Sequence, residues 1–243
     1  MPDKFMYQTL TEAPFEKPLL LVRVADSSFA ARLRHMGIFE GMELIRIRED
    51  VKLQPLRARC RSGDAVIGGG MSAKIVVHLD DGRKLPLAEM ASGETGHIEG
   101  MTGGAGLSGA LSVLGFKMDE RITLIRRLPP MDYVVFLEKK GRIHLTESMA
   151  AKIWGETDKK MLQFNYAGKG RQFNVKSILG GENAREMLHA RGIEPGVILV
   201  LEGVNPARSF YMSKQNPIIV STKNGLRLFL EQKNADKIFV KEK

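Results

Sequence analysis

Three similar stretches decide the fold: MGIFEGMELI at residues 36–45, LGFKMDERITLI at 114–125 and RGIEPGVILV at 191–200. Each contains a glycine, a hydrophobic residue, a two-residue turn and then an alternating or apolar run, a pattern typical of a helix end followed by a strand. The glycines, Gly37, Gly115 and Gly192, are 78 and 77 residues apart. This regular spacing indicates a repeated structural unit.

A second landmark repeats in step with the first: MSAKIVV at 71–77, MAAKIWG at 149–155 and NADKIFV at 234–240. The interval from the landmark glycine to the lysine is 37 residues in the first two copies and 45 in the third. We therefore predict an N-terminal extension at 1–17 and three tandem units at 18–86, 87–158 and 159–243, the last including a linker. The additional residues of the third copy are expected within GVNPARSFYMSKQNP at 203–217.

Each unit is expected to contain a strand, a short helix that ends at the landmark glycine, a second strand, a proline-marked loop and further short strands. The incoming strands are expected at 19–24, 96–101 and 173–178, and the outgoing strands at 42–47, 121–126 and 197–202. About five short strands in a unit of this size are typical of a small, strongly bent barrel. The sequence thus predicts a mainly β fold with short helices, arranged as three tandem small β-barrels.

The spacing G-x-G-x-x-G, which occurs in dinucleotide-binding folds, is formed by Gly104, Gly106 and Gly109. No acidic residue follows at the expected distance of about 20 residues, and the third copy keeps only the first pair of glycines, as Gly180 and Gly181. We therefore interpret Gly103 and Gly104 as turn residues before a helix at about 107–114. Gly115 is expected to end that helix in the left-handed conformation, like Gly37 and Gly192.

The composition is that of a globular protein with a basic surface. Of the 243 residues, 43% are hydrophobic, and the formal net charge is +9, of which +8 belongs to residues 159–243. An acidic protein surface, a phosphate backbone or anionic lipid could meet this excess, and a solvated basic surface would explain it equally well. With one cysteine, no apolar N-terminal segment and no long apolar run, the chain is expected to be soluble and cytoplasmic.

The residues that could carry chemistry do not form a recognisable motif. The five histidines, His35, His78, His97, His144 and His189, neither recur between units nor lie at ligand spacing with a carboxylate. A metal site shared by the units is therefore not expected, although a single site between units, for example from His144 with Glu147 or from Cys60, stays open. We predict no catalytic residue, no metal ligand and no cofactor, and we leave binding of a divalent transition metal such as iron open.

Basic residues are the candidates for partner contact. Lys74, Lys152 and Lys237 each precede an isoleucine that is expected to close a barrel, so each is either part of a solvated face or a partner contact present once per unit. The predicted partner-binding residues are Lys74, Lys152, Lys237, Arg185 and Arg191.

The order of landmarks resembles the FeoA family, small cytosolic accessory proteins of bacterial ferrous iron uptake. The middle unit carries the resemblance best, through the Gly-rich turn into a leucine helix, Leu-Gly-Phe at 114–116 and a basic strand end before proline. The first unit matches more loosely through Met-Gly-Ile at 36–38, and the third through Gly-Ile-Glu-Pro-Gly at 192–196. The middle unit departs from the pattern by Met118-Asp119 in place of Pro-Gly.

This resemblance implies a fold of SH3-like β-barrels. It also implies a non-enzymatic protein that docks on the cytosolic GTPase domain of the FeoB transporter and is associated with the membrane only through that partner. The alternative is a metal-responsive regulator, or a nucleic-acid- or protein-binding scaffold, built of SH3-like barrels. Similar barrels occur in metal-dependent repressors related to the diphtheria toxin repressor. We find no helix-turn-helix and no interleaved aromatic residues for base stacking, so nucleic-acid binding is not favoured. The oligomeric state is not encoded in any of these motifs.

Overall fold

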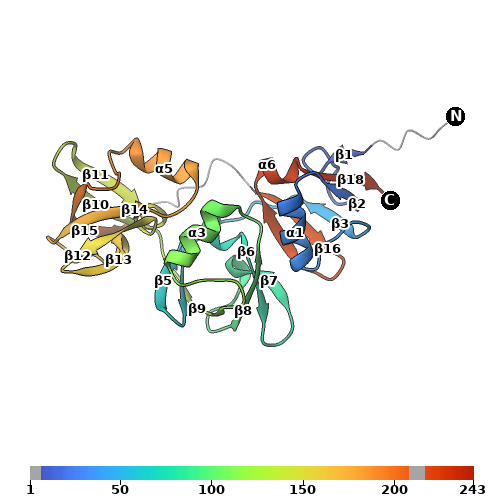
Figure 1. The fold of residues 1–243 in the computed structure, drawn as a ribbon, viewed down its shortest axis with the longest axis horizontal. Helices are drawn as coiled ribbons and strands as arrows, with labels where there is room; N and C mark the ends of the chain where they lie inside the picture. The colour runs from blue at the N-terminus through green and yellow to red at the C-terminus, as the bar shows by residue number, and fades with distance from the viewer. Residues whose placement is uncertain (1–6, 208–216) are drawn as a thin grey trace.

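Three six-stranded antiparallel sheets, each bent into a small barrel, lie in a row (Figure 1). They come from a computed structural model, which describes residues 7–207 and 217–243. We name them the terminal barrel, which holds both ends of the chain, the central barrel and the distal barrel. The predicted mainly β fold with short helices is confirmed.

The sheet of the terminal barrel contains, in spatial order, β1 (Gln8–Thr9), β18 (Ile238–Glu242), β2 (Pro18–Val24), β3 (Glu43–Ile47), β16 (Ile218–Thr222) and β17 (Arg227–Leu230). Its helices are α1 (Ser27–His35) and α6 (Gln232–Ala235). The strand β1 pairs with β18, and Leu10 and Ala13 are buried in the core. The segment predicted as an extension is therefore part of this barrel from Gln8 onward.

The sheet of the central barrel contains β5 (Gly63–Ile67), β4 (Leu56–Cys60), β9 (Arg121–Arg127), β8 (Thr95–Met101), β6 (Ile75–Leu79) and β7 (Lys84–Pro86). Its helical segments are α2 (Gly69–Ser72), the 3-10 turn η1 (Leu87–Glu89) and α3 (Ala105–Val113).

The sheet of the distal barrel contains β11 (Gly141–Thr146), β10 (Met131–Leu137), β15 (Ile198–Pro206), β14 (Gln172–Ile178), β12 (Ile153–Thr157) and β13 (Lys160–Gln163). Its helical segments are α4 (Glu147–Ala150), the 3-10 turn η2 (Phe164–Tyr166) and α5 (Glu182–His189). The three barrels therefore share one strand order and the placement of two helices, and the central and distal barrels also share a 3-10 turn.

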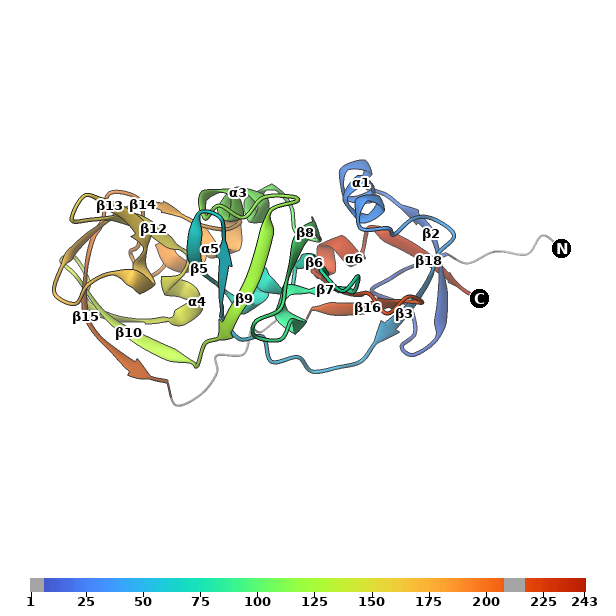
Figure 2. The same cartoon turned by 90° about the horizontal axis from the view of Figure 1, so that it is seen from below.

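The sheets do not follow the boundaries of the predicted units. Each barrel combines the strand-helix-strand half of one repeat with the later strands of another: the central barrel takes β8 and β9 from the second repeat and β4 to β7 from the first. The distal barrel joins the third repeat to the second in the same way, and the terminal barrel joins the first to the third. The chain thus runs from the terminal to the central to the distal barrel and back (Figures 1 and 2).

The physical reason for this exchange is that similar repeats have interchangeable halves. A half-barrel from one copy presents the same strand edges as the corresponding half from another, so an exchange keeps every type of strand pairing. The connections at 48–55 and 128–130 carry the chain into the next sheet instead of back across its own. The third connection, between β15 and β16, includes residues 208–216, which lie outside the described part of the chain.

The landmark glycines end the helices α1, α3 and α5. Gly37, Gly115 and Gly192 have φ values of +85°, +86° and +81°, which only glycine adopts without steric cost. The residue after each glycine donates its amide to a carbonyl five residues back, as in Phe116 to Leu111 at 2.8 Å. This arrangement closes the helix and directs the chain into the following strand.

Each barrel has its own hydrophobic core, and the barrels also contact one another. Gln163 of the distal barrel, 2% exposed, accepts a hydrogen bond from the amide of Val66 in the central barrel (2.9 Å) and donates to its carbonyl (2.8 Å). On the other side, Asn234 of the terminal barrel donates to the carbonyl of Thr102 in the central barrel (3.0 Å). Buried polar contacts of this kind fix the barrels relative to each other, because breaking them leaves unsatisfied backbone groups.

Candidate functional site

Two histidines and a glutamate converge on neighbouring strands of the central barrel. Nδ1 of His78 on β6 and Nε2 of His97 on β8 lie 3.5 and 3.4 Å from the same oxygen, Oε2 of Glu99. The two imidazole rings are 5.0 Å apart between centroids. All three side chains are half-buried, and within the described residues they form the one group of three or more nitrogen, sulfur or carboxylate donors close enough to share an ion.

A β-bulge sets the position of Glu99. His78 lies directly opposite His97, but the register then shifts, so that Val77 pairs with Ile98 and Val76 with Gly100. Glu99 is the additional residue, left without a partner on β6. A bulge of this kind changes the direction of a side chain relative to the regular pleat. Here the carboxylate of Glu99 lies beside both imidazoles.

The second oxygen of Glu99 is held by a lysine. Lys84 on β7 places its ammonium 2.5 Å from Oε1, which leaves Oε2 for the histidines. Burial raises the pKa of the Glu99 carboxyl, but Lys84, His78 and His97 together outweigh it and hold that pKa below its ordinary value. The carboxylate is therefore ionised at neutral pH and available as a ligand.

The other metal candidates considered from the sequence are not brought together. His144 contacts Asp132 through Nδ1 at 2.6 Å, on the exposed side of the distal barrel. Glu147 is 5% exposed and instead accepts hydrogen bonds from the Tyr133 hydroxyl at 3.0 Å and the Asn165 amide at 2.7 Å. Burial raises the pKa of the Glu147 carboxyl.

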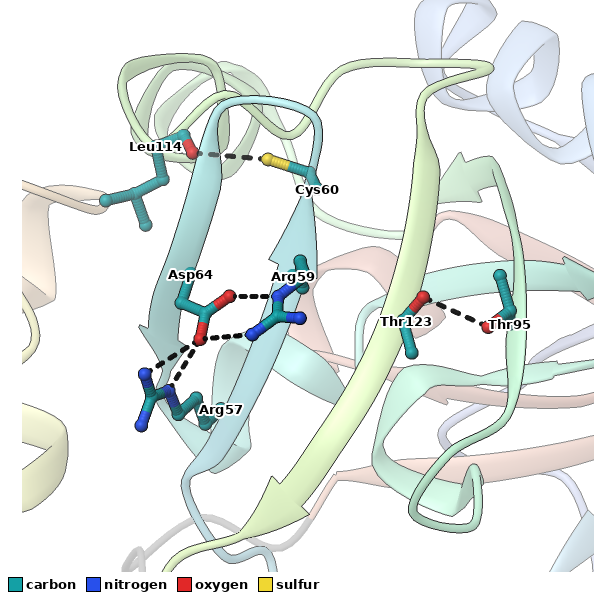
Figure 3. Close-up of polar contacts among 7 residues, drawn as sticks. All are labelled: Arg57, Arg59, Cys60, Asp64, Thr95, Leu114 and Thr123. Atoms are coloured by element: carbon teal, nitrogen blue, oxygen red, sulfur yellow. Dashed lines mark hydrogen bonds and ion pairs between the residues drawn. The ribbon is translucent and has the colours of Figure 1, made fainter.

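Cys60 lies inside the central barrel and not in a reactive position. Figure 3 shows its thiol directed toward the carbonyl oxygen of Leu114, at a distance of 3.8 Å. Arg57 and Arg59 alternate with Ala58 and Cys60 on β4, so the arginines face outward, where both pair with Asp64. Strand alternation therefore separates the cysteine from its basic neighbours in the sequence.

The landmark lysines have a structural role in common and different side-chain partners. The carbonyls of Lys74, Lys152 and Lys237 accept hydrogen bonds from the amides of Thr102, Leu179 and Ala25 (2.9, 2.7 and 2.8 Å). In side-chain contacts, Lys237 pairs with Asp26 at 2.7 Å and Lys74 with Glu231. Burial, with the charge of Lys74, lowers the pKa of the half-buried Lys152.

The two arginines predicted to contact a partner lie on and just after α5 in the distal barrel. Arg185 is exposed and 3.6 Å from Glu182. Arg191 is half-buried and donates to the carbonyl of Met187 at 2.8 Å. The basic excess of residues 159–243 is divided between the distal and terminal barrels, because β14 and β15 belong to one and β16 to β18 to the other. Partner contact by these basic residues stays a prediction.

A groove of about 360 Å³ lies between the central and distal barrels. Its lining includes Ser62 to Ala65, Ser112 to Gly115, Lys117, Trp154, Met161 to Gln163 and Tyr166. Three of these side chains are apolar or aromatic and strongly exposed: Val113 (48%), Met161 (48%) and Tyr166 (40%). Exposed apolar groups gathered along a groove are typical of a protein contact surface.

A comparison with known families identifies a segment that contributes to both this groove and the cluster of His78, His97 and Glu99. Residues 85–157 match the family model of the FeoA domain. The FeoA match begins in β7 and ends with β12, so it takes in part of the central barrel and part of the distal barrel. It includes His97 and Glu99, whereas His78 precedes it. The chain matches no curated protein and no solved structure.

FeoA domains form a family of non-catalytic accessory domains associated with ferrous iron transport, and the match supports the resemblance inferred from the sequence. The match does not extend to the first and third repeats, whose resemblance to FeoA stays a prediction from the sequence. None of the helices in the described residues is long and apolar enough to cross a membrane.

The sequence contained part of the signal for the histidine cluster. His97 and Glu99 are two residues apart in a predicted strand, which is the spacing of neighbours along one strand face. His78 could not be added, because its partner strand belongs to the next repeat and the pairing between repeats is not visible in a linear pattern.

Proposed function

We propose that this protein is a non-enzymatic accessory protein of ferrous iron transport, which acts in the cytoplasm by docking on the GTPase domain of a FeoB-like transporter. The observation that carries the proposal is the FeoA match at 85–157. It is supported by the exposed groove that lies between the two barrels to which the matched segment contributes.

The groove suits a protein partner better than a small substrate. Its exposed apolar side chains come from two barrels, Val113 from the central and Met161 and Tyr166 from the distal. Lys117 is among its lining residues and can pair with an acidic group of the partner. A central apolar contact with a charged rim is the usual anatomy of a protein interface.

Binding of the purified protein to the GTPase domain of a FeoB-like transporter from the same organism tests the proposal, by biolayer interferometry in buffer containing a chelator. We expect Val113→Glu and Met161→Glu each to weaken binding at least tenfold, because a buried unpaired charge at an interface costs more than about 1.4 kcal/mol. Phe39→Glu in the terminal barrel is the matched control, since Phe39 is also apolar and 55% exposed but lies outside the groove.

Retention of binding by the Phe39 variant and its loss in the groove variants would support docking at this surface. Equal binding by all three variants would place the contact elsewhere, and no binding by the unaltered protein would contradict the proposed function. A steep loss of binding to nucleic acid with added salt would instead favour the scaffold alternative.

A further inference from the structure

We propose that His78, His97 and Glu99 form a binding site for one divalent first-row transition-metal ion, held between two repeats in the central barrel. The ligand atoms would be Nδ1 of His78, Nε2 of His97 and Oε2 of Glu99. The inference goes beyond docking on a partner and rests on the geometry of this cluster alone.

The distances between the donor atoms fit a shared ion. Atoms bound to a central ion at about 2.0–2.2 Å in tetrahedral geometry lie about 3.3–3.6 Å from one another. The measured separations from Oε2 of Glu99 are 3.5 Å to His78 and 3.4 Å to His97, and all three donors lie within 4.8 Å of one another. Little rearrangement is needed for the three atoms to surround an ion.

The types of donor decide the class of ion. Two imidazole nitrogens with one carboxylate oxygen suit Zn²⁺, Fe²⁺ or Co²⁺, whereas Ca²⁺ and Mg²⁺ prefer oxygen ligands throughout and Cu⁺ prefers sulfur. The side chains of His78 and His97 are 32% and 41% exposed. The ion can therefore enter from solvent and keep water at its remaining positions.

Equivalent positions in the other two barrels show that the bulge is general while the ligands are specific to one copy. The same register shift leaves Val22 unpaired in β2 and Lys176 unpaired in β14, at intervals of 77 residues from Glu99. In the distal barrel, Lys176 pairs with Glu156 at 3.1 Å, so a side-chain cation neutralises the carboxylate there. In the central barrel the residue at the bulge is Glu99. The nearest histidines, His78 on β6 and His97 on β8, lie opposite each other in the register.

The charges around the cluster are arranged on the strands to either side. Lys84 on β7 contacts the outer oxygen of Glu99, and Arg121 on β9, opposite His97, is paired with Asp80 at 2.6 Å. The ammonium of Lys84 orients the carboxylate, in the way that outer partners orient metal ligands. Its positive charge also opposes cation binding, so we expect moderate affinity in place of an irreversible structural site.

Titration of the tag-free, chelator-treated protein with Co²⁺ and Zn²⁺ tests the proposal. We expect one ion per chain, a visible Co²⁺ absorption band, and competition by anaerobic Fe²⁺ but not by excess Mg²⁺. His78→Ala, His97→Ala and Glu99→Gln should each weaken Zn²⁺ binding at least tenfold.

His144→Ala is the matched control. His144 is also a surface histidine beside a carboxylate, Asp132, but it belongs to no group of three donors in the described residues. This variant should keep the one ion. Thermal unfolding in the presence of chelator shows whether each variant is folded. If an alanine variant does not fold, Glu99→Gln still tests the site, because glutamine keeps the shape of the glutamate side chain.

The proposal is overturned if the unaltered protein binds no ion, or if binding survives in His78→Ala, His97→Ala and Glu99→Gln. Loss of binding only in His144→Ala would place the ion in the distal barrel and also overturn it. Because metal binding is measured without a partner and docking is measured in chelator, failure of one proposal is distinguishable from failure of the other.

Discussion

The carbonyl of Lys74 accepts a hydrogen bond from the amide of Thr102 at 2.9 Å, although the two residues belong to different repeats. The corresponding bonds from Leu179 to Lys152 and from Ala25 to Lys237 occur in the other barrels. Each bond joins the end of an incoming strand to the start of the closing strand of another repeat. Each repeat therefore shares its strands with the other two, and no barrel is complete without two repeats.

The contact between barrels at Gln163 is expected to contribute strongly to stability. Its side chain bonds the amide and carbonyl of Val66 and also donates to the carbonyl of Ala151 at 2.6 Å. Gln163→Ala leaves these buried backbone groups unsatisfied and should lower the free energy of unfolding by about 1–3 kcal/mol. Urea unfolding measures the change. The exposed Gln172→Ala should stay within about 0.5 kcal/mol of the unaltered protein, and an equal effect of both would contradict the assigned role.

Two glycines of α3 should respond in opposite directions to alanine. A Cβ at Gly106 would lie 2.8 Å from Cα of Gly181, in the turn before α5 of the distal barrel, whereas a Cβ at Gly109 meets nothing within 4 Å. Gly109→Ala should therefore stabilise the protein by about 1 kcal/mol through helix propensity. Gly106→Ala should destabilise it, because backbone must move. Thermal melts of the two variants test this, and stabilisation by both would show that the barrels are not packed at this point.

Glu147 should make stability depend on pH. Its pKa is raised above the ordinary value of 4.5 by burial, so the folded protein holds a proton that the unfolded chain has released. The favourable contribution of protonated Glu147 to the free energy of unfolding is complete below pH 4.5. It is lost as pH rises through the pKa that Glu147 has in the folded protein. Glu147→Gln keeps the acceptor for Tyr133 and should gain stability relative to the unaltered protein as pH rises from 4.5.

Urea unfolding of both proteins at several pH values between 4 and 8 measures this difference. The exposed Glu138→Gln controls for the loss of one charge. A Glu147→Gln difference that stays constant over the range would show that Glu147 is not buried as a carboxylic acid.

The repeat pattern was sufficient to predict the incoming and outgoing strands, the helices that end at the landmark glycines and the turns at those glycines, because these depend on local features, but it led to about five strands per unit where each sheet has six. The helix expected at about 107–114 is observed at Ala105–Val113, and the strand expected at 96–101 at Thr95–Met101. The pairing of the strands could not be predicted in the same way. Strand edges of similar repeats are equivalent, so the sequence does not distinguish pairing within a repeat from pairing between repeats.

The same ambiguity concealed the histidine cluster. His78 lies 19 residues before His97, in another predicted unit, and the two become neighbours only because β6 pairs with β8. If each repeat formed its own sheet, β8 would pair with β12 and Glu156 would lie opposite His97. The metal site thus depends on the exchange of halves between repeats.

Disulfide trapping in the full-length chain tests the interlocked arrangement most directly. Glu156 and Asn174 are register partners between β12 and β14, which come from different repeats. Partners in antiparallel strands have Cα atoms about 4.5–5.5 Å apart, within the range that a disulfide requires. With Cys60 replaced by serine, Glu156→Cys with Asn174→Cys should form an intrachain disulfide on mild oxidation, detected by mass spectrometry of unreduced peptides.

The competing pair is Asn174→Cys with Lys241→Cys, which would be register partners if the third repeat formed its own sheet. In the interlocked chain these residues lie in the distal and terminal barrels and should not be linked. A disulfide between positions 156 and 174 alone is the result we predict. A disulfide between 174 and 241, with none between 156 and 174, would contradict the exchange of halves and the metal site that depends on it.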